Sequence, residues 1–295
     1  MPLLDKLREQ YGVGPVCSEL HIAPSTYYHC QQQRHHPDKR SARAQRDDWL
    51  KKEIQRVYDE NHKVYGVRKV WRQLLREGIR VARCTVARLM AVMGLAGVLR
   101  GKKVRTTISR KAVVAGDRVN RQFVAERPDQ LWVADSTYVS TWQGVVYVAF
   151  IIDVFAGYIV GWRVSSSMET TFVLDALEQA LWARRPSGTV HHSDKGSQYV
   201  SLAYTQRLKE AGLLASTGST GDSYDNAMAE SINGLYKAEV IHRKSWKNRA
   251  EVELATLTWV DWYNNRRLLE RLGHTPPAEA EKAYYASIGN DDLAA

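Results

Sequence analysis

The chain has 295 residues, of which 44% are hydrophobic, and a formal net charge of +10. This length suits about two domains, and no run of roughly 18 apolar residues is present that would predict a transmembrane helix. The N-terminal segment lacks the charged start and apolar stretch of a signal peptide, and the three cysteines are widely spaced. We therefore expect a cytoplasmic protein with reduced thiols and no membrane partner.

The first segment, residues 1–47, is expected to be a small helical unit. Residues 16–28 have the pattern of a short helix-turn-helix, with Ser25 as a candidate helix cap. Residues 31–37 are polar and end in proline, which is typical of a linker.

Residues 48–107 are expected to form an all-α domain of the helix-turn-helix type. Apolar residues recur at helical spacing in three runs, at residues 50–58, 67–75 and 86–93. Glycines follow the second and third runs, where they would end a helix. Because residues 78–81 form a short connection between the last two runs, the pattern indicates a helix-turn-helix.

Positive charge is concentrated in residues 62–125. This stretch holds 16 Lys and Arg against two acids, a net charge of +14, so the rest of the chain sums to −4. Such a density favours a nucleic acid, because each neutralised phosphate releases counterions. A solvated tail is the alternative, which the apolar periodicity of the first half disfavours. The candidate DNA-binding residues are Arg80, Arg83, Arg88, Lys102, Lys103 and Arg105.

Residues 108–125 have little apolar periodicity and are expected to be a basic linker that lies along DNA. An α/β domain follows at residues 126–288, and residues 289–295 are left as a C-terminal tail. The predicted elements of the α/β domain are a meander of three strands, then helix, strand, helix, strand and helix. The middle strand of the meander is nearly continuous in apolar residues, as in a strand buried on both faces. This order matches a ribonuclease H-like fold.

Three carboxylates lie in three separate motifs of this domain. Asp135 closes Leu-Trp-Val-Ala-Asp, Asp194 lies in His-Ser-Asp-Lys-Gly-Ser-Gln-Tyr, and Glu230 lies in Asp-Asn-Ala-Met-Ala-Glu-Ser. The first two residues close strand-like runs and the third lies on a helix, so one sheet edge can gather all three around divalent metal ions. Asp194 and Glu230 are separated by 35 residues. A lone Asp after a strand is more often a turn or cap, but the combination favours a catalytic site.

These motifs resemble those of bacterial transposases of the insertion-sequence three family, second-frame type, which have a retroviral-integrase-like Asp-Asp-Glu core. The resemblance includes residues 65–70, 86–90 and 272–279 and covers nearly the whole chain. It implies an integrase core preceded by an all-α helix-turn-helix region. It also implies that Asp135, Asp194 and Glu230 are the catalytic and metal-binding residues, with two Mg²⁺ or Mn²⁺ ions and Asp135 as the shared ligand.

Two neighbours of these acids have predicted roles. Lys237 follows Glu230 by seven residues, hence on the same helix face, where its ammonium group can meet a DNA phosphate. A solvated lysine is the alternative. His192 is expected to pack or hydrogen-bond beside Asp194 rather than to bind metal.

The implied activity is metal-dependent DNA cleavage and strand transfer of an insertion sequence. The expected partners are the element's ends, the target DNA, further copies of the chain on DNA, and the product of an upstream reading frame or a fusion with it. A metal-dependent nuclease and an inactive DNA-binding regulator are alternatives on the same fold, and the intact acids disfavour the regulator.

Overall fold

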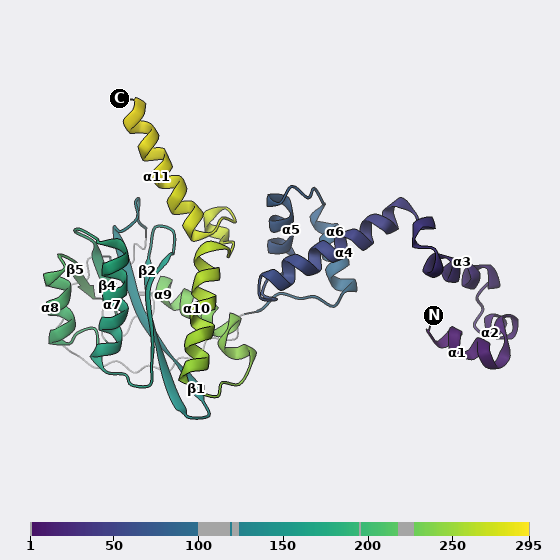
Figure 1. Cartoon of the computed structure of the whole chain (residues 1–295), viewed down its shortest axis with the longest axis horizontal. Helices are drawn as coiled ribbons and strands as arrows, with labels where there is room; N and C mark the ends of the chain where they lie inside the picture. Colours follow the sequence, from purple (N-terminus) through teal and green to yellow (C-terminus); the bar gives the residue numbers. More distant parts are fainter. Residues whose placement is uncertain (1, 100–118, 120–123, 195, 218–226, 295) are drawn as a thin grey trace.

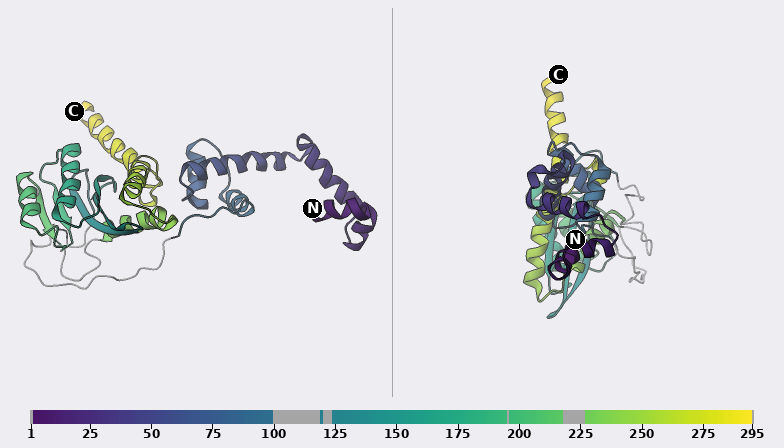
Figure 2. Two further views of the ribbon diagram at one scale, coloured as in Figure 1. Left: turned by 60° about the horizontal axis from the view of Figure 1, so that its bottom comes forward. Right: turned by 90° about the vertical axis from the view of Figure 1, so that its right-hand side faces the viewer.

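The structure is a computed structural model that describes residues 2–99, 119, 124–194, 196–217 and 227–294. The candidate DNA-binding residues Lys102, Lys103 and Arg105 lie outside the described residues. Figures 1 and 2 show an α/β domain at one end, a helical region beside it, and the N-terminal helices at the far end of the long helix α4.

The N-terminal unit contains α1 (Pro2–Tyr11), α2 (Val13–Glu19), α3 (Pro24–His35) and the short η1 (Pro37–Lys39). A small core of Leu4, Val16, Cys17 and Tyr27 holds it together. Two local predictions are wrong. Helix α3 begins at Pro24 with Ala23 as its N-cap, so Ser25 lies inside the first turn; proline suits this position because the missing N–H would have no partner there. The predicted linker from residue 31 is the continuation of α3, since its glutamines are good helix formers and no proline occurs between Pro24 and Pro37.

The helical region consists of α4 (Ala42–Glu60), α5 (Val67–Arg76) and α6 (Arg83–Val92). Each helix buries one apolar face, as the periodicity predicts. The turn between α5 and α6 contains Gly78 at φ +83°, a left-handed conformation that glycine adopts without strain. The Trp71 indole N–H donates to the Val81 carbonyl at 2.8 Å and ties this turn to α5. The helix-turn-helix prediction is confirmed at the level of fold.

The α/β domain is built on a sheet whose described strands have the order β3-β2-β1-β4-β5. β1 pairs antiparallel with β2 and parallel with β4; β2 pairs antiparallel with β3, and β4 parallel with β5. The strands are β1 (Leu131–Thr141), β2 (Gly144–Asp153), β3 (Ile159–Ser165), β4 (Val190–Ser193) and β5 (Leu214–Thr217).

Helices cover both faces of this sheet, and successive residues of β1 serve opposite faces because side chains alternate along a strand. Trp132 and Ala134 belong to one apolar cluster with α7 and α8, whereas Val133 and Val139 belong to the other with α9 and α10. The elements after the meander are α7 (Thr170–Arg184), α8 (Leu202–Glu210), α9 (Ala227–Glu239), η2 (Ile241–Arg243), α10 (Arg249–Asn265), η3 (Glu270–Leu272) and α11 (Pro277–Ala294). The ribonuclease H-like order of elements is confirmed.

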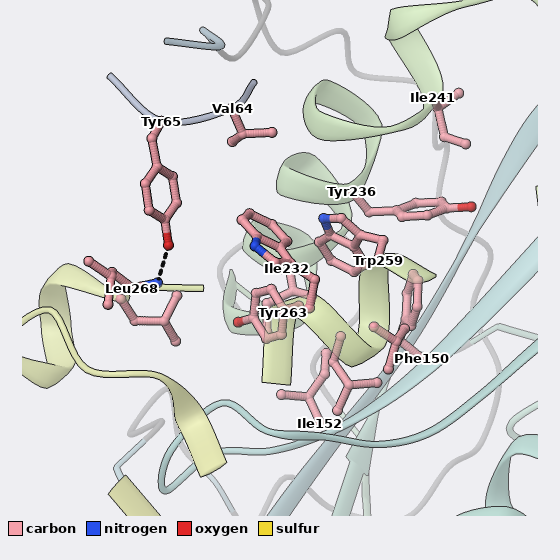
Figure 3. Close-up of a cluster of buried hydrophobic side chains, with 14 of the residues drawn as sticks. Val64, Tyr65, Phe150, Ile152, Ile232, Tyr236, Ile241, Trp259, Tyr263 and Leu268 are labelled. Carbon is pink, nitrogen blue, oxygen red and sulfur yellow. Dashed lines mark hydrogen bonds between the residues drawn. The ribbon is translucent and has the colours of Figure 1, made fainter. Parts of the chain in front are cut away.

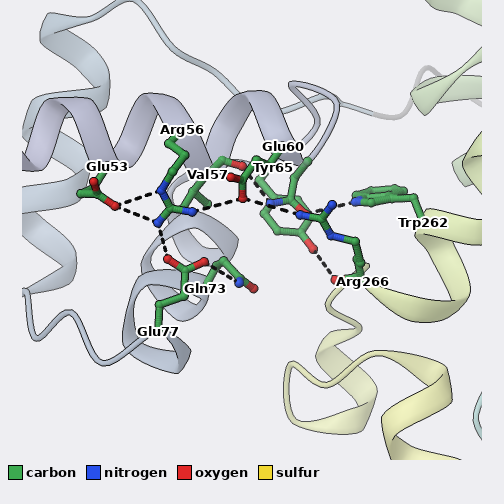
Figure 4. Close-up of polar contacts among 10 residues, drawn as sticks. Glu53, Arg56, Val57, Glu60, Tyr65, Gln73, Glu77, Trp262 and Arg266 are labelled. Carbon is green, nitrogen blue, oxygen red and sulfur yellow. Dashed lines mark hydrogen bonds and ion pairs between the residues drawn. The ribbon is translucent and has the colours of Figure 1, made fainter.

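The helical region and the α/β domain share one apolar cluster. Val64 and Tyr65, in the loop before α5, lie beside Leu268, just after α10 (Figure 3). Polar contacts surround this junction (Figure 4): the Trp262 indole N–H donates to the Asn61 side-chain oxygen at 3.1 Å, and Arg266 lies 3.6 Å from Glu60. Buried apolar and polar contacts therefore join the two regions.

In the part of the chain that the structure describes, we find no helix with the length and apolar character needed to cross a membrane.

Candidate active site

Asp135 and Asp194 come together through the parallel pairing of β1 and β4. In that register Ala134 lies opposite Ser193, the last residue of β4, so Asp194 leaves the sheet beside Asp135. The sequence suggested that Asp135 closes its strand. This expectation is wrong, because β1 continues to Thr141. The reason is that β2 pairs along the whole of β1, whereas the shorter β4 ends partway along its other edge.

A tight turn holds the Asp194 carboxylate in place. The backbone N–H of Gly196 donates to Asp194 Oδ1 at 2.9 Å. A Cβ atom added at Gly196 would lie 2.9 Å from that same oxygen and 3.0 Å from Gln198 Oε1. A side chain at this position would therefore require the Asp194 carboxylate and the Gln198 amide to shift.

Glu230 lies in the first turn of α9, and the next turn of that helix reaches Asp135 directly. Asn233 Nδ2 donates to Asp135 Oδ2 at 2.8 Å, while the Ser136 backbone N–H donates to Asp135 Oδ1, also at 2.8 Å. The sequence analysis missed Asn233. The signal was its spacing of three residues from Glu230, which places both side chains on one helix face.

Burial and electrostatic repulsion among the three acids raise the pKa values of Asp135 and Asp194. Burial, and then the charges of Asp194 and Glu230, raise the pKa of Asp135 to about 7, although the bonds from Ser136 and Asn233 act in the opposite direction. Burial and Glu230 likewise raise the pKa of Asp194, against the Gly196 N–H bond that lowers it. A bound cation would relieve this repulsion, because an opposite charge favours the ionised carboxylates.

The carboxylates are neighbours without forming a closed ligand cluster. Among the described residues, no group of three or more His, Cys, Asp and Glu side chains is gathered tightly enough to hold a metal ion. The donor set nevertheless suits magnesium or manganese, since three carboxylates supply only oxygen ligands.

The two histidines before Asp194 have structural contacts on opposite faces of the sheet. His192 is buried and its Nδ1 lies 2.9 Å from the Ser216 hydroxyl of β5, in line with the predicted packing role. His191 Nε2 lies 3.1 Å from the Tyr204 hydroxyl. Burial lowers the pKa of His191 to about 4, so this imidazole is neutral at physiological pH.

The remaining predicted residues lie at the surface. Lys237 Nζ is 5.4 Å from the centre of the Tyr138 ring, which is half-exposed on β1. Arg83 is exposed at the start of α6, and Arg80 is exposed in the turn before it. Arg88 differs, because its Nη2 donates to both oxygens of Asp47 at 2.9 Å.

Comparison with known proteins decides the family. The integrase core domain model matches residues 125–223, a second integrase core domain model matches residues 211–277, and the HTH-like domain model matches residues 45–103. Over its whole length the chain is 98% identical to the full-length transposase for insertion sequence element IS629 of Shigella sonnei. The chain belongs to the insertion-sequence transposases.

A more distant relative supports the same family. The putative transposase for IS986/IS6110 of Mycobacterium tuberculosis is 54% identical over 90% of this transposase and 96% of that protein. Among solved structures, the catalytic core domain of HTLV-2 integrase in complex with magnesium is 13% identical over 53% of this chain and 98% of that one, with a TM-score of 0.41.

The predicted assignment to the insertion-sequence three family is confirmed, together with the integrase core and the helix-turn-helix region. This transposase is an enzyme of DNA cleavage and strand transfer, as the sequence motifs indicated.

Proposed function

We propose that Asp135, Asp194 and Glu230 hold the divalent ions with which this transposase cuts and joins DNA. The observation that carries the proposal is the meeting of β1, the end of β4 and α9, where Asp135 lies beside Asp194 and bonds to Asn233. Two divalent ions, when bound, activate the attacking oxygen and stabilise the leaving oxygen of a phosphodiester.

The protein side of the reaction follows from these contacts. Asp135, at the centre, would contribute to holding both ions, Asp194 would hold one of them and Glu230 the other. Asn233 and the Ser136 N–H fix the orientation of the Asp135 carboxylate. Lys237 lies on the same face of α9 as Glu230, two helical turns further along, and meets a phosphate of the bound DNA end.

The helical region supplies affinity for DNA in this proposal. Arg80 and Arg83 are exposed at the turn and the start of α6, where a second helix of this type approaches DNA. Arg88 can join them once its pairing with Asp47 is released. Lys102, Lys103 and Arg105 continue the basic run in the sequence, and the basic stretch at residues 108–125 follows them.

Assembly on DNA is also part of the proposal. Joining two element ends requires both ends in one complex, so we infer at least a dimer on DNA. An upstream-frame product, or a fusion with it, would add the selectivity for element ends that phosphate contacts do not provide. The test compares joining of terminal-repeat DNA with joining of scrambled DNA, with and without the fusion. High discrimination by the unfused chain would remove the need for this partner.

Substitution of the acids tests the metal site. Asp135→Asn, Asp194→Asn and Glu230→Gln should each abolish cleavage and strand transfer in Mg²⁺ and in Mn²⁺ while DNA binding persists, because an amide is a weaker ligand of nearly equal volume. Asp175→Asn is the matched control, since Asp175 is an exposed acid of the same domain that pairs with Arg163. Near wild-type strand transfer by any of the three variants would remove that residue from the site.

A further inference from the structure

A second site lies at the junction of the two regions, away from the three acids. A cavity of about 220 Å³ opens between α5 and the turn that follows η3, lined by Arg72, Leu75, Arg76, Gly273 and His274. This volume is well above the roughly 30 Å³ that one water occupies in the liquid. The cavity therefore has room for a small ligand.

The walls of the cavity are rich in positive charge. Arg72 and Arg76 are one helical turn apart and so lie on the same face of α5. The Arg72 guanidinium stacks on the Trp71 ring at 4.7 Å, and Arg72 makes no ion pair with any residue that the structure describes. Stacking holds the guanidinium plane and leaves its N–H edge for hydrogen bonds.

The acids nearby are already paired. Arg76 Nη2 donates to both oxygens of Glu279 at 2.7 Å, and Arg68 pairs with Glu270. Each of these two acids thus neutralises another arginine, and neither neutralises the positive charge of Arg72. An anion in the cavity would neutralise it.

His274 adds a buried polar atom without a partner. The residue is 9% exposed, and its Nε2 has no hydrogen-bond partner among the described residues. Burial, and then the charge of Arg72, lower the pKa of His274. A neutral imidazole with an N–H at Nε2 needs an acceptor, because an unpaired buried donor is destabilising.

We propose that this cavity binds a phosphate group through Arg72 and His274, with Arg76 and its partner Glu279 at its edge. The Arg72 guanidinium is a donor only and matches the oxygens of phosphate, and His274 is a donor to phosphate in the tautomer that carries its proton on Nε2. Arg72 comes from the helical region and His274 lies between η3 and α11 of the α/β domain, so the anion bridges the two. The phosphate is either one of the DNA backbone or a free phosphate ion; the first source rests on the transposase's action on DNA.

The experiment uses the full chain and two probes, inorganic phosphate and a duplex DNA. Arg72→Met keeps the aliphatic stem and removes the charge. His274→Asn removes Nε2 and retains a residue type that tolerates the left-handed backbone of His274, φ +66°. Arg207→Met is the matched control, because Arg207 is an exposed arginine that pairs with Glu178 on α7, as Arg76 pairs with Glu279.

We expect phosphate, titrated at constant ionic strength, to bind the wild type and to raise its melting temperature. Arg72→Met and His274→Asn should each weaken phosphate binding at least about tenfold, the loss of one charge-assisted hydrogen bond, and Arg207→Met should leave it unchanged. If DNA is the source, Arg72→Met should also reduce the slope of log affinity against log salt by about 0.9.

The outcomes distinguish a phosphate of the DNA backbone from a free phosphate ion. A loss of phosphate binding with an unchanged DNA salt slope assigns the site to free phosphate. No phosphate binding by the wild type, together with unchanged DNA binding by Arg72→Met, overturns the proposal. Asp135→Asn should bind phosphate as the wild type does. A wrong assignment of the metal ligands would therefore not affect the test of the phosphate site.

Discussion

The hydroxyl of Tyr65 and the backbone of Leu268, which are 203 residues apart, are joined by a buried hydrogen bond. The Leu268 N–H donates to the Tyr65 oxygen at 2.8 Å, and the Tyr65 hydroxyl donates to the Arg266 carbonyl at 3.2 Å. Both Tyr65 and Leu268 are fully buried. One side chain of the helical region thus satisfies two backbone groups of the α/β domain, which fixes the helices relative to the sheet that carries the three acids.

Tyr65→Phe should therefore destabilise the whole chain. Removing the hydroxyl leaves the buried Leu268 N–H and the part-buried Arg266 carbonyl without this partner, at a cost of about 1–3 kcal/mol. Chemical denaturation measures the free energy of unfolding. Tyr58→Phe is the control, because its hydroxyl donates to the Ala96 carbonyl at 2.9 Å in an exposed position, and it should cost less. Equal stability of the wild type and Tyr65→Phe would show that the bond does not support the junction.

Asn233→Ala should lower strand transfer without unfolding the protein. Its amide holds the Asp135 carboxylate, and loss of such a supporting partner typically costs about 10–100-fold in metal affinity or activity. The half-maximal Mg²⁺ concentration should rise as well. Asn265→Ala, which removes two bonds to Asp261 within α10, should leave both quantities unchanged. An unaltered Mg²⁺ requirement for Asn233→Ala would argue against this orienting role.

The stability of the metal-free protein should depend on pH through Asp135. Its pKa is raised from 3.8 to about 7 in the folded chain, so the folded state binds the proton more tightly than the unfolded state. Ionisation in the unfolded chain therefore reduces stability progressively between these two values, and the loss is complete above the folded pKa.

Asp135→Asn should accordingly melt at a higher temperature than the wild type at about pH 8 in a chelator, and the difference should shrink as the pH approaches about 4. Adding Mg²⁺ at the higher pH should stabilise the wild type and have less effect on the variant. A difference in melting temperature that does not change with pH would contradict the raised pKa.

The basic residues of α6 should contribute unequally to DNA binding. Arg83→Gln should reduce the salt slope by about 0.9, the loss of one phosphate contact. Arg88→Gln should reduce it less, because Arg88 already pairs with Asp47. Asp47→Asn should increase DNA affinity by releasing Arg88. Equal slopes for the Arg83 and Arg88 variants would show that DNA displaces the Asp47 pair completely.

The order of helices and strands in the α/β domain and the helical hairpin of α5 and α6 could be predicted from the amino-acid sequence, which also singled out the three acids. These features are local: apolar periodicity reports which face of an element is buried, and each motif is a short stretch of chain. Local patterns were weaker at the N-terminus, where the polar residues at 31–35 continue α3 because nothing in them stops a helix.

The contacts between groups that are distant in the sequence could not be predicted without the folded structure. The position of Asp135 within β1 depends on the different lengths of β2 and β4 beside it, and its contact with Asn233 depends on how α9 packs on the sheet. The charge of residues 62–125 gave no sign that Arg68 and Arg76 would pair with Glu270 and Glu279 near the other end of the chain. Composition counts charges, whereas their pairing depends on distances that exist only once the chain has folded.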